Sequence, residues 1–451
     1  MLFSSALFIF VFLPLSLILY YLSPSRIKNL TLLLLSLCFY GFGEPVYILV
    51  MLATIFVDFL FGIAIERFCN IKRKLLIASV SLNVISLGVF KYLPPISDSF
   101  GFGIKIALPV GISFYTFQAL SYVVDVYRGT KAQRDPVCFG LYITMFPQLI
   151  AGPIVKYADI EPYLKARSVS VKDAYRGIGR FVSGLAKKLL LANSAGSMWE
   201  YFSSLNGSLS TLGAWLGIIF FAFQIYFDFS GYSDMAIGLG TFFGFKFPEN
   251  FNYPYTATSI KDFWSRWHIS LTDWFREYVY IPLGGNRRGE IRTYLNMLVV
   301  WALTGIWHGA GASFLLWGLY YFILLSLERL FLGKLIKRLP YVLSRAYTIV
   351  LVLFSWVFFA LPDTKSITEY LSSMLTFSAP SENEIYHFVR NIPFLIILAL
   401  GATNLPRLAY EELTKKRSSE AFFFGGGVLL FFLCIANLMG QSYNPFLYFR
   451  F

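Results

Sequence analysis

Long apolar segments recur along this chain, and they restrict its fold more than any other feature. A helix of about 20 apolar residues spans the roughly 30 Å of hydrocarbon in a bilayer. Because a chain in lipid has to satisfy its own backbone hydrogen bonds, we expect these segments to be helical. The sequence therefore predicts an all-α polytopic membrane protein with roughly 11–13 transmembrane or re-entrant helices. The main apolar segments are residues 7–21, 46–65, 75–89, 107–124, 178–192, 212–229, 294–330, 348–361, 392–405 and 422–438.

The composition and the charge pattern agree with a chain that faces lipid. Hydrophobic residues make up 57% of the 451 positions, and charged residues make up only 14%. Lys and Arg gather in alternate short loops, which the positive-inside rule places in the cytoplasm. These loops explain the formal net charge of +13 without a nucleic-acid partner. They lie near residues 26–28, 67–74, 128–134, 334–338 and 415–417.

The same loops predict where the two ends of the chain lie. No Lys or Arg precedes Arg26, so the first apolar segment lacks the positive region of a cleaved signal peptide. We expect a retained helix with the N-terminus outside the cytoplasm, and the succession of loops places the C-terminus outside as well. The protein is then a multi-pass protein of a cytoplasmic membrane, in contact with membrane lipid.

The longest polar segment between apolar ones, residues 246–292, mixes charged and aromatic side chains. Some of its aromatic and apolar residues are spaced three and four apart, which is typical of an amphipathic helix at a membrane interface. We expect one such helix here, either as an interfacial anchor or as part of a functional site. The residues with this spacing are Trp264, Trp267, Leu271, Trp274 and Tyr278.

Two carboxylates, Asp228 and Asp234, stand at the end of the apolar segment 212–229 and just beyond it. Acids within a membrane usually face a water-filled cavity or a partner group. The sequence predicts that both acids line an internal cavity, with the alternative that Asp234 caps the next helix. The other residues expected to line this cavity are Tyr226, Ser230 and Trp307.

Only three histidines occur in the chain. His308 belongs to a Trp-His-Gly-Ala run inside the apolar stretch 294–325, where an ionisable residue is costly and therefore a functional candidate. His268 lies in the polar segment, whereas His387 lies in a polar loop and is expected to be incidental. A buried imidazole can take a proton from a hydroxyl, as acyl transfer to an alcohol requires. The motifs of zinc proteases, nucleotide sites and serine hydrolases are absent from the sequence, so we expect no metal and no permanently bound cofactor.

Four stretches carry a more specific pattern: LPVGISFY at 108–115, YFDFSGYSDMAIGLG at 226–240, FWSRWHISL at 263–271 and GIWHGA at 305–310. Together they resemble the membrane-bound O-acyltransferase (MBOAT) family, and most of all its bacterial alginate and peptidoglycan O-acetyltransferase branch. The resemblance runs in order from Phe3 to about Arg329. It implies a single domain over 1–451, a catalytic core at about 105–330, helices around a central funnel, and a place in the bacterial inner membrane.

The resemblance also implies a chemistry. Acetyl-CoA would donate its acetyl group from the cytoplasmic side, and the group would leave on the other side. His308 matches the family's membrane-embedded catalytic histidine, the expected general base, and His268 matches its second histidine, whose role stays open. Guanidinium groups bind phosphate well, so either CoA phosphates or lipid headgroups are expected at several arginines. These are Arg266, Arg276, Arg287 and Arg288.

Residues 441–451 form an aromatic tail that ends in Phe-Leu-Tyr-Phe-Arg-Phe. Its spacing is similar to a C-terminal motif of the related teichoic acid D-alanylation machinery, where a tyrosine is thought to carry the acyl group. By that analogy, Tyr448 would enter the funnel, accept the acetyl group with the help of His308 and pass it on. The alternative is an aromatic anchor at the membrane interface.

The resemblance thus predicts an O-acetyltransferase for an extracytoplasmic polysaccharide, either peptidoglycan or an alginate-like polymer. The family usually works with a separate SGNH or serine-hydrolase-like transferase outside the membrane, and the loops here are too short to form one. The alternative is a membrane transporter or a scaffold of a polysaccharide-modifying complex. A transporter would also have Gly- and Pro-broken helices and intramembrane acids, but the two halves of the chain show no convincing duplication.

Overall fold

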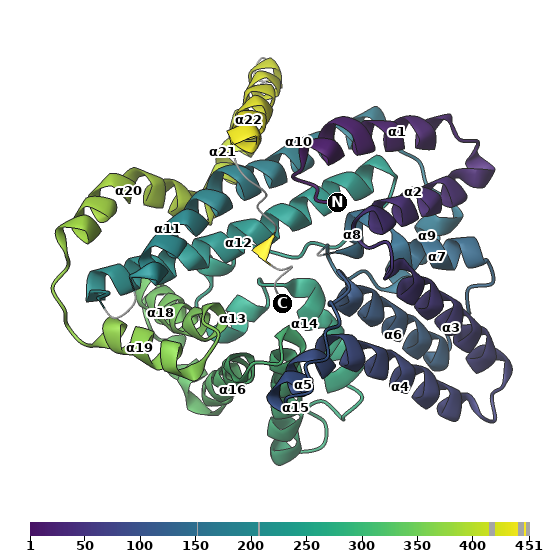
Figure 1. Ribbon diagram of the computed structural model, residues 1–451, viewed down its shortest axis with the longest axis horizontal. Helices are drawn as coiled ribbons and strands as arrows, with labels where there is room; N and C mark the ends of the chain where they lie inside the picture. The colour runs from purple at the N-terminus through teal and green to yellow at the C-terminus, as the bar shows by residue number, and fades with distance from the viewer. Residues whose placement is uncertain (151, 206–207, 415–419, 441–445, 448–451) are drawn as a thin grey trace. The chain divides into compact units, whose positions relative to one another are not determined.

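The computed structural model describes residues 1–150, 152–205, 208–414, 420–440 and 446–447. All regular elements in these ranges are helices (Figure 1), which confirms the predicted all-α fold class. The chain divides into two compact units. The first unit is Met1–Gly184 with Tyr232–Glu249, and the second is Leu185–Gly231 with Asn250–Phe451.

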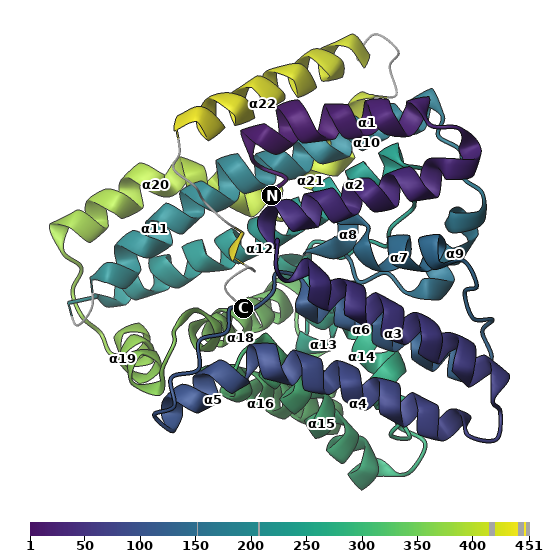
Figure 2. The ribbon, with the colours of Figure 1, turned by 45° about the vertical axis from the view of Figure 1, so that its right-hand side comes forward.

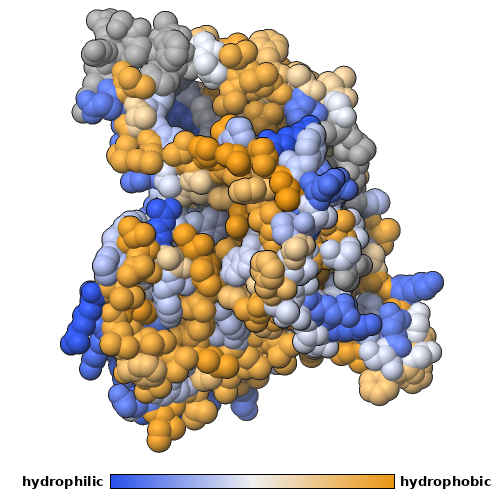
Figure 3. All heavy atoms as spheres, turned by 90° about the vertical axis from the view of Figure 1, so that its left-hand side faces the viewer, coloured by the Kyte–Doolittle hydropathy of each residue, from blue (hydrophilic) through white to orange (hydrophobic). Residues whose placement is uncertain are grey.

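Among the described residues, six helices are long and apolar enough to cross a membrane. Two shorter apolar helices, Phe8–Leu22 and Phe424–Gly440, add to them. Many large hydrophobic side chains are exposed on these helices other than Thr211–Phe242. Apolar residues cover much of the face that Figure 3 shows. A water-facing surface would not leave so much apolar area uncovered. The six helices are α3 (Ile48–Arg67), α4 (Lys72–Lys91), α12 (Thr211–Phe242), Ala312–Ile336 (α16 and the turns that continue it), α18 (Tyr341–Ala360) and α20 (Glu382–Gly401).

In the first unit, α3, α4 and α6 (Ile112–Arg128) pack against one another (Figure 2). Gly62 on α3 lets α6 approach closely, because a Cβ there would lie 2.4 Å from the hydroxyl of Tyr122. Polar contacts also join α3 to α4. The buried carboxylate of Asp58 accepts hydrogen bonds from Ser79 at 2.7 Å and from Asn83 at 2.9 and 3.0 Å. A buried acid is thereby satisfied within a helix pair.

In the second unit, α15 (Glu290–His308) and α16 (Ala312–Leu327) form a tight antiparallel hairpin. Two glycines allow the close approach. A Cβ at Gly305 would lie 2.5 Å from the carbonyl oxygen of Phe314, and one at Gly318 would lie 2.4 Å from that of Trp301. Substitution at either glycine would therefore force the two backbones apart. The predicted run 294–330 does contain two helices, and the turn between them follows His308 directly.

The expected single amphipathic helix across residues 264–278 is wrong. The structure has α13 (Ile260–Trp264) and α14 (Ile269–Phe275), and the chain turns between them at His268. The side chains of Trp264 and Trp267 are buried in an aromatic cluster rather than at an interface. Trp264, for example, packs its ring 4.7 Å from Trp301 and 4.9 Å from Tyr321. Tertiary packing of the indoles overrides the helical spacing.

Candidate functional site

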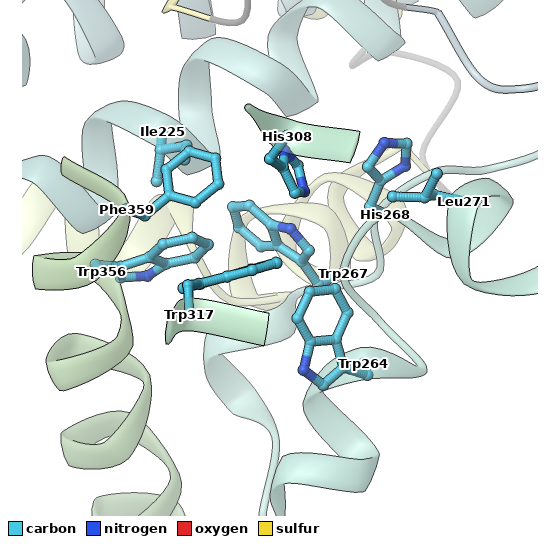
Figure 4. Close-up of a pocket in the computed structure, with 9 residues that line it drawn as sticks. All are labelled: Ile225, Trp264, Trp267, His268, Leu271, His308, Trp317, Trp356 and Phe359. Atoms are coloured by element: carbon cyan, nitrogen blue, oxygen red, sulfur yellow. The ribbon is translucent and has the colours of Figure 1, made fainter. Parts of the chain in front are cut away.

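Both His268 and His308 line one small cavity in the second unit (Figure 4). The cavity measures about 10 Å³, which is close to the room that one water molecule needs. In Figure 4 the two imidazoles lie near the top of the view, and the indoles of Trp264 and Trp317 lie below them. Apart from the histidines, all of the lining side chains are aromatic or aliphatic. They are Ile225 on α12, Trp264 on α13, Trp267, Leu271 on α14, Trp317 on α16, and Trp356 and Phe359 on α18.

His308 is the last residue of α15, and only 5% of it is exposed. Its ring lies edge-on to two aromatic rings, with centroids 5.0 Å from Trp317 and 5.0 Å from Phe359. The carbonyl end of a helix carries partial negative charge. The helix end favours the imidazolium that would form when His308 takes a proton.

His268 is held by the side chain of Asn250. The Asn250 Oδ1 atom accepts hydrogen bonds from the backbone N–H of Ser270 at 3.2 Å and from its hydroxyl at 2.9 Å, so this atom is the amide oxygen. The Nδ1 atom of His268 lies 3.1 Å from the same oxygen and must therefore donate. This tautomer puts the lone pair of the neutral ring on Nε2. Burial lowers the pKa of His268 to about 3, so the ring is neutral near pH 7.

The backbone of His268 is in the left-handed region, with φ 45° and ψ 53°. Among the described residues, Tyr253 is the other non-glycine residue with positive φ, at 47°. Such a conformation costs about 1 kcal/mol or more for a residue with a Cβ. Backbone hydrogen bonds enforce it here, from Ile269 N–H to Asn250 C=O at 3.0 Å and from Asn252 N–H to Arg266 C=O at 2.9 Å.

Of the five residues expected to line a funnel, none lines this cavity. Tyr226 is buried in the aromatic cluster, with its ring 6.3 Å from that of Trp267, and Ser230 is buried on the same helix. The buried ring of Trp307 lies 6.4 Å from that of His268. Their role along a funnel stays a prediction.

The two carboxylates of α12 have different surroundings. Asp228, in the second unit, forms an ion pair of 2.6 Å with Lys188, and both side chains are buried. Asp234, in the first unit, accepts a hydrogen bond of 2.7 Å from Arg180. The alternative that Asp234 caps a following helix is wrong, because α12 continues to Phe242.

The four arginines expected to bind phosphate are at the surface or paired with a neighbour. Arg266 donates to Asp262 at 2.8 Å, and Arg276 pairs with Asp273 at 2.9 Å. Arg287 and Arg288 are exposed in the turn before α15. Phosphate binding by these groups stays a prediction.

Some residues of interest were missed or cannot be placed. Tyr448 lies outside the described residues, although Phe446 and Leu447 just before it are described. Sequence reasoning missed Lys188, which lies in an apolar segment, and Asn250, which lies in the loop between α12 and the helical turn at Pro254–Thr256. A lysine within an apolar segment is itself a signal for a functional or paired charge, and could have found the first of these.

Comparison with known proteins identifies the class. The sequence model of MBOAT, the membrane-bound O-acyltransferase family, matches residues 135–372. The chain belongs to this family, so both the resemblance and the multi-pass membrane character expected from the apolar segments are confirmed.

The relatives include enzymes that modify envelope polymers. A probable alginate O-acetylase of Pseudomonas aeruginosa is 38% identical over 400 residues, covering 85% of this chain and 77% of the relative. A peptidoglycan O-acetyltransferase of Helicobacter pylori is 34% identical over 420 residues, covering 83% and 80%. A teichoic acid D-alanyltransferase of Bacillus subtilis is 28% identical over 255 residues, covering 54% and 64%.

Proposed function

We propose that this protein is an O-acetyltransferase that takes acetyl from cytoplasmic acetyl-CoA and delivers it to an extracytoplasmic polysaccharide. The observation that carries the proposal is the meeting of two histidines in one aromatic-lined cavity, in a chain of an acyltransferase family. Relatives of similar length that act on alginate and peptidoglycan support acetyl as the acyl group. They also support either of these polymers, or a similar one, as the acceptor.

His308 is the general base in this proposal. It takes the proton of the attacking hydroxyl as that oxygen bonds to the thioester carbonyl carbon, and it returns the proton to the departing CoA sulfur. The carbonyl end of α15 stabilises the transient imidazolium. The aromatic and aliphatic side chains around the cavity exclude water and lower the local dielectric constant, which strengthens this interaction.

His268 has a different part because its ring stays neutral while His308 carries the proton. With Nδ1–H committed to Asn250, Nε2 acts as an acceptor. We assign it the positioning of a hydroxyl or of the pantetheine arm near the cavity. The cavity has room for about one water molecule, so we expect its walls to rearrange when the acetyl group of the donor enters.

The remaining parts of the proposal concern sidedness and partners. Basic loops on the cytoplasmic side of a bacterial inner membrane leave both termini outside. Tyr448 receives the acetyl group as an ester and passes it to a separate SGNH-type transferase, which acetylates the polymer. Arg266, Arg276, Arg287 and Arg288 contact CoA phosphates or lipid headgroups.

The test is transfer of radiolabelled acetyl from acetyl-CoA by the purified protein in detergent. We expect CoA release and labelled protein with wild type, loss of both by a factor of about 10³ or more in His308→Ala, and loss of protein label in Tyr448→Phe. His387→Ala is the matched control, because His387 packs against Tyr201, with a ring separation of 4.1 Å, and does not line the cavity.

Two results would change the proposal. If Tyr448→Phe keeps full labelling of the protein, the relay through this tyrosine is wrong while the transferase stands. If no sample releases CoA, with folded protein and a candidate partner present, the transporter or scaffold alternative takes its place.

A further inference from the structure

The described part of the C-terminal tail contacts the buried ion pair of the second unit. The backbone N–H of Leu447 donates to the Asp228 Oδ2 atom at 2.6 Å. The Lys188 ammonium lies 4.7 Å from the centroid of the Phe446 ring, and this phenylalanine is 1% exposed. Both ribbon views show this piece of the tail beside α12 (Figures 1 and 2).

The ion pair itself is unusual for a membrane protein. The side chains of Lys188 and Asp228 are 3% and 4% exposed, and their charged atoms are 2.6 Å apart. Removing two charges from water is costly, and a close partner offsets that cost only when additional hydrogen bonds satisfy the charged groups. The tail supplies such a bond to Asp228 and an aromatic face to Lys188.

The contact lies close to the histidine cavity. Asp228 is three residues after Ile225 on α12, so the two side chains share a face of the helix, about 4.5 Å apart along its axis. The next residue, Phe229, has its ring 4.7 Å from that of His268. Leu447 also packs against the aromatic cluster around the cavity.

We propose that Lys188 and Asp228 form a docking clamp for the C-terminal tail of this same chain. Asp228 binds the tail through a main-chain N–H, and Lys188 binds it through the Phe446 ring. The clamp fixes the chain one residue before Tyr448 and about one helical turn from the cavity. Its use in presenting Tyr448 to His308 rests on the proposed function, whereas the docking itself does not.

Hydrogen–deuterium exchange of the Leu447 amide measures the clamp directly, because that amide makes the bond. In wild type in detergent we expect it to exchange at least tenfold more slowly than an unprotected peptide amide. Two variants should each raise the rate about tenfold. Phe446→Ala removes the ring from the tail and leaves the helices unchanged. Lys188→Met with Asp228→Leu removes both charges together, so no unpaired charge stays buried.

Asp234→Asn is the matched control. It alters a carboxylate of the same helix that pairs with Arg180, so the Leu447 rate should not change. The clamp is overturned if wild type shows no protection, or if Phe446→Ala and a folded double variant keep the wild-type rate.

Acetyl transfer, measured on the same samples, separates the two proposals. If Leu447 loses protection while labelling of the protein persists, the clamp stands and its role in presenting Tyr448 is wrong. If Leu447 keeps its protection in both variants, the clamp is wrong whatever the transfer assay gives.

Discussion

The histidine cavity and the Lys188–Asp228 clamp, both in the second unit, each bury polar side chains away from water. They stabilise these side chains in opposite ways. In the histidine cavity, burial keeps His268 neutral, and Asn250 satisfies its Nδ1–H. At the clamp, Lys188 and Asp228 keep full charges and compensate each other at 2.6 Å. The first site avoids charge, and the second balances it.

The difference indicates what each site is suited to do. The neutral ring of His268 can accept a hydrogen bond without becoming charged, so this site suits positioning a group during a reaction. An ion pair gains its stability by staying intact, so it suits holding a segment in place. Both sites use the same stretch of α12, which contributes Ile225 to one and Asp228 to the other.

The largest loss of stability is expected when one partner of the buried ion pair is removed. Asp228→Ala leaves the buried Lys188 ammonium without its carboxylate, which should lower the free energy of unfolding by about 3–5 kcal/mol. This loss is measured as a lower melting temperature in detergent, with size-exclusion chromatography used to monitor how much folded protein remains after heating. Ser230→Ala is the control, since it removes from the same helix a buried hydroxyl that makes no hydrogen bond to the described residues, so we expect stability to change by less than about 1 kcal/mol. Equal melting temperatures for the two variants would contradict the compensation argument.

A smaller loss of stability is expected when the pH is lowered, because of His268 in the histidine cavity. The pKa of His268 is about 3 in the folded protein and 6.5 for an ordinary histidine, so the unfolded chain binds more protons between these values. The contribution of His268 to the free energy of unfolding is therefore complete above about pH 6.5, and it is lost as the pH falls towards 3. From pH 6.5 to about pH 4.5 we expect a loss of about 2–3 kcal/mol.

His268→Asn isolates that contribution. Asparagine tolerates the left-handed backbone and does not titrate, so this part of the acid sensitivity should disappear. Melting temperatures of wild type and variant, compared at several pH values, provide the measurement. Parallel curves for the two proteins would show that His268 is not the group responsible.

The smallest effect is expected at the other carboxylate of α12. Arg180 is paired with both Asp234 and Glu249, and its side chain is 37% exposed. Asp234→Asn therefore leaves a solvated guanidinium with a second carboxylate, and the expected cost is about 1 kcal/mol or less. A loss as large as that of Asp228→Ala would mean that burial is not what distinguishes the two ion pairs.

The sequence predicts the fold class and the family well, and for clear reasons. Apolar segments reveal membrane helices because length and composition alone decide whether a segment can cross lipid. His308 stood out because an ionisable residue in an apolar stretch is rare. Its position at the very end of α15, and its sharing of a cavity with His268, needed the structure.

The misses come from contacts between residues distant in the chain. The spacing of Trp264 and Trp267 predicted a helix because helical periodicity contains no information on the partners that bury these indoles. Lys188 and Asp228 are 40 positions apart, and the tail reaches them from residues 446–447. No local pattern links these three segments.

The tight turn between α15 and α16 has a consequence for the synthesis of the protein. α15 is not among the six strongly apolar helices, whereas α16 is, and only residues 309–311 separate them. A weakly apolar segment enters the membrane poorly by itself. We therefore expect the two helices to leave the ribosome and enter the bilayer as one hairpin, with α16 carrying α15 and its terminal imidazole into the lipid.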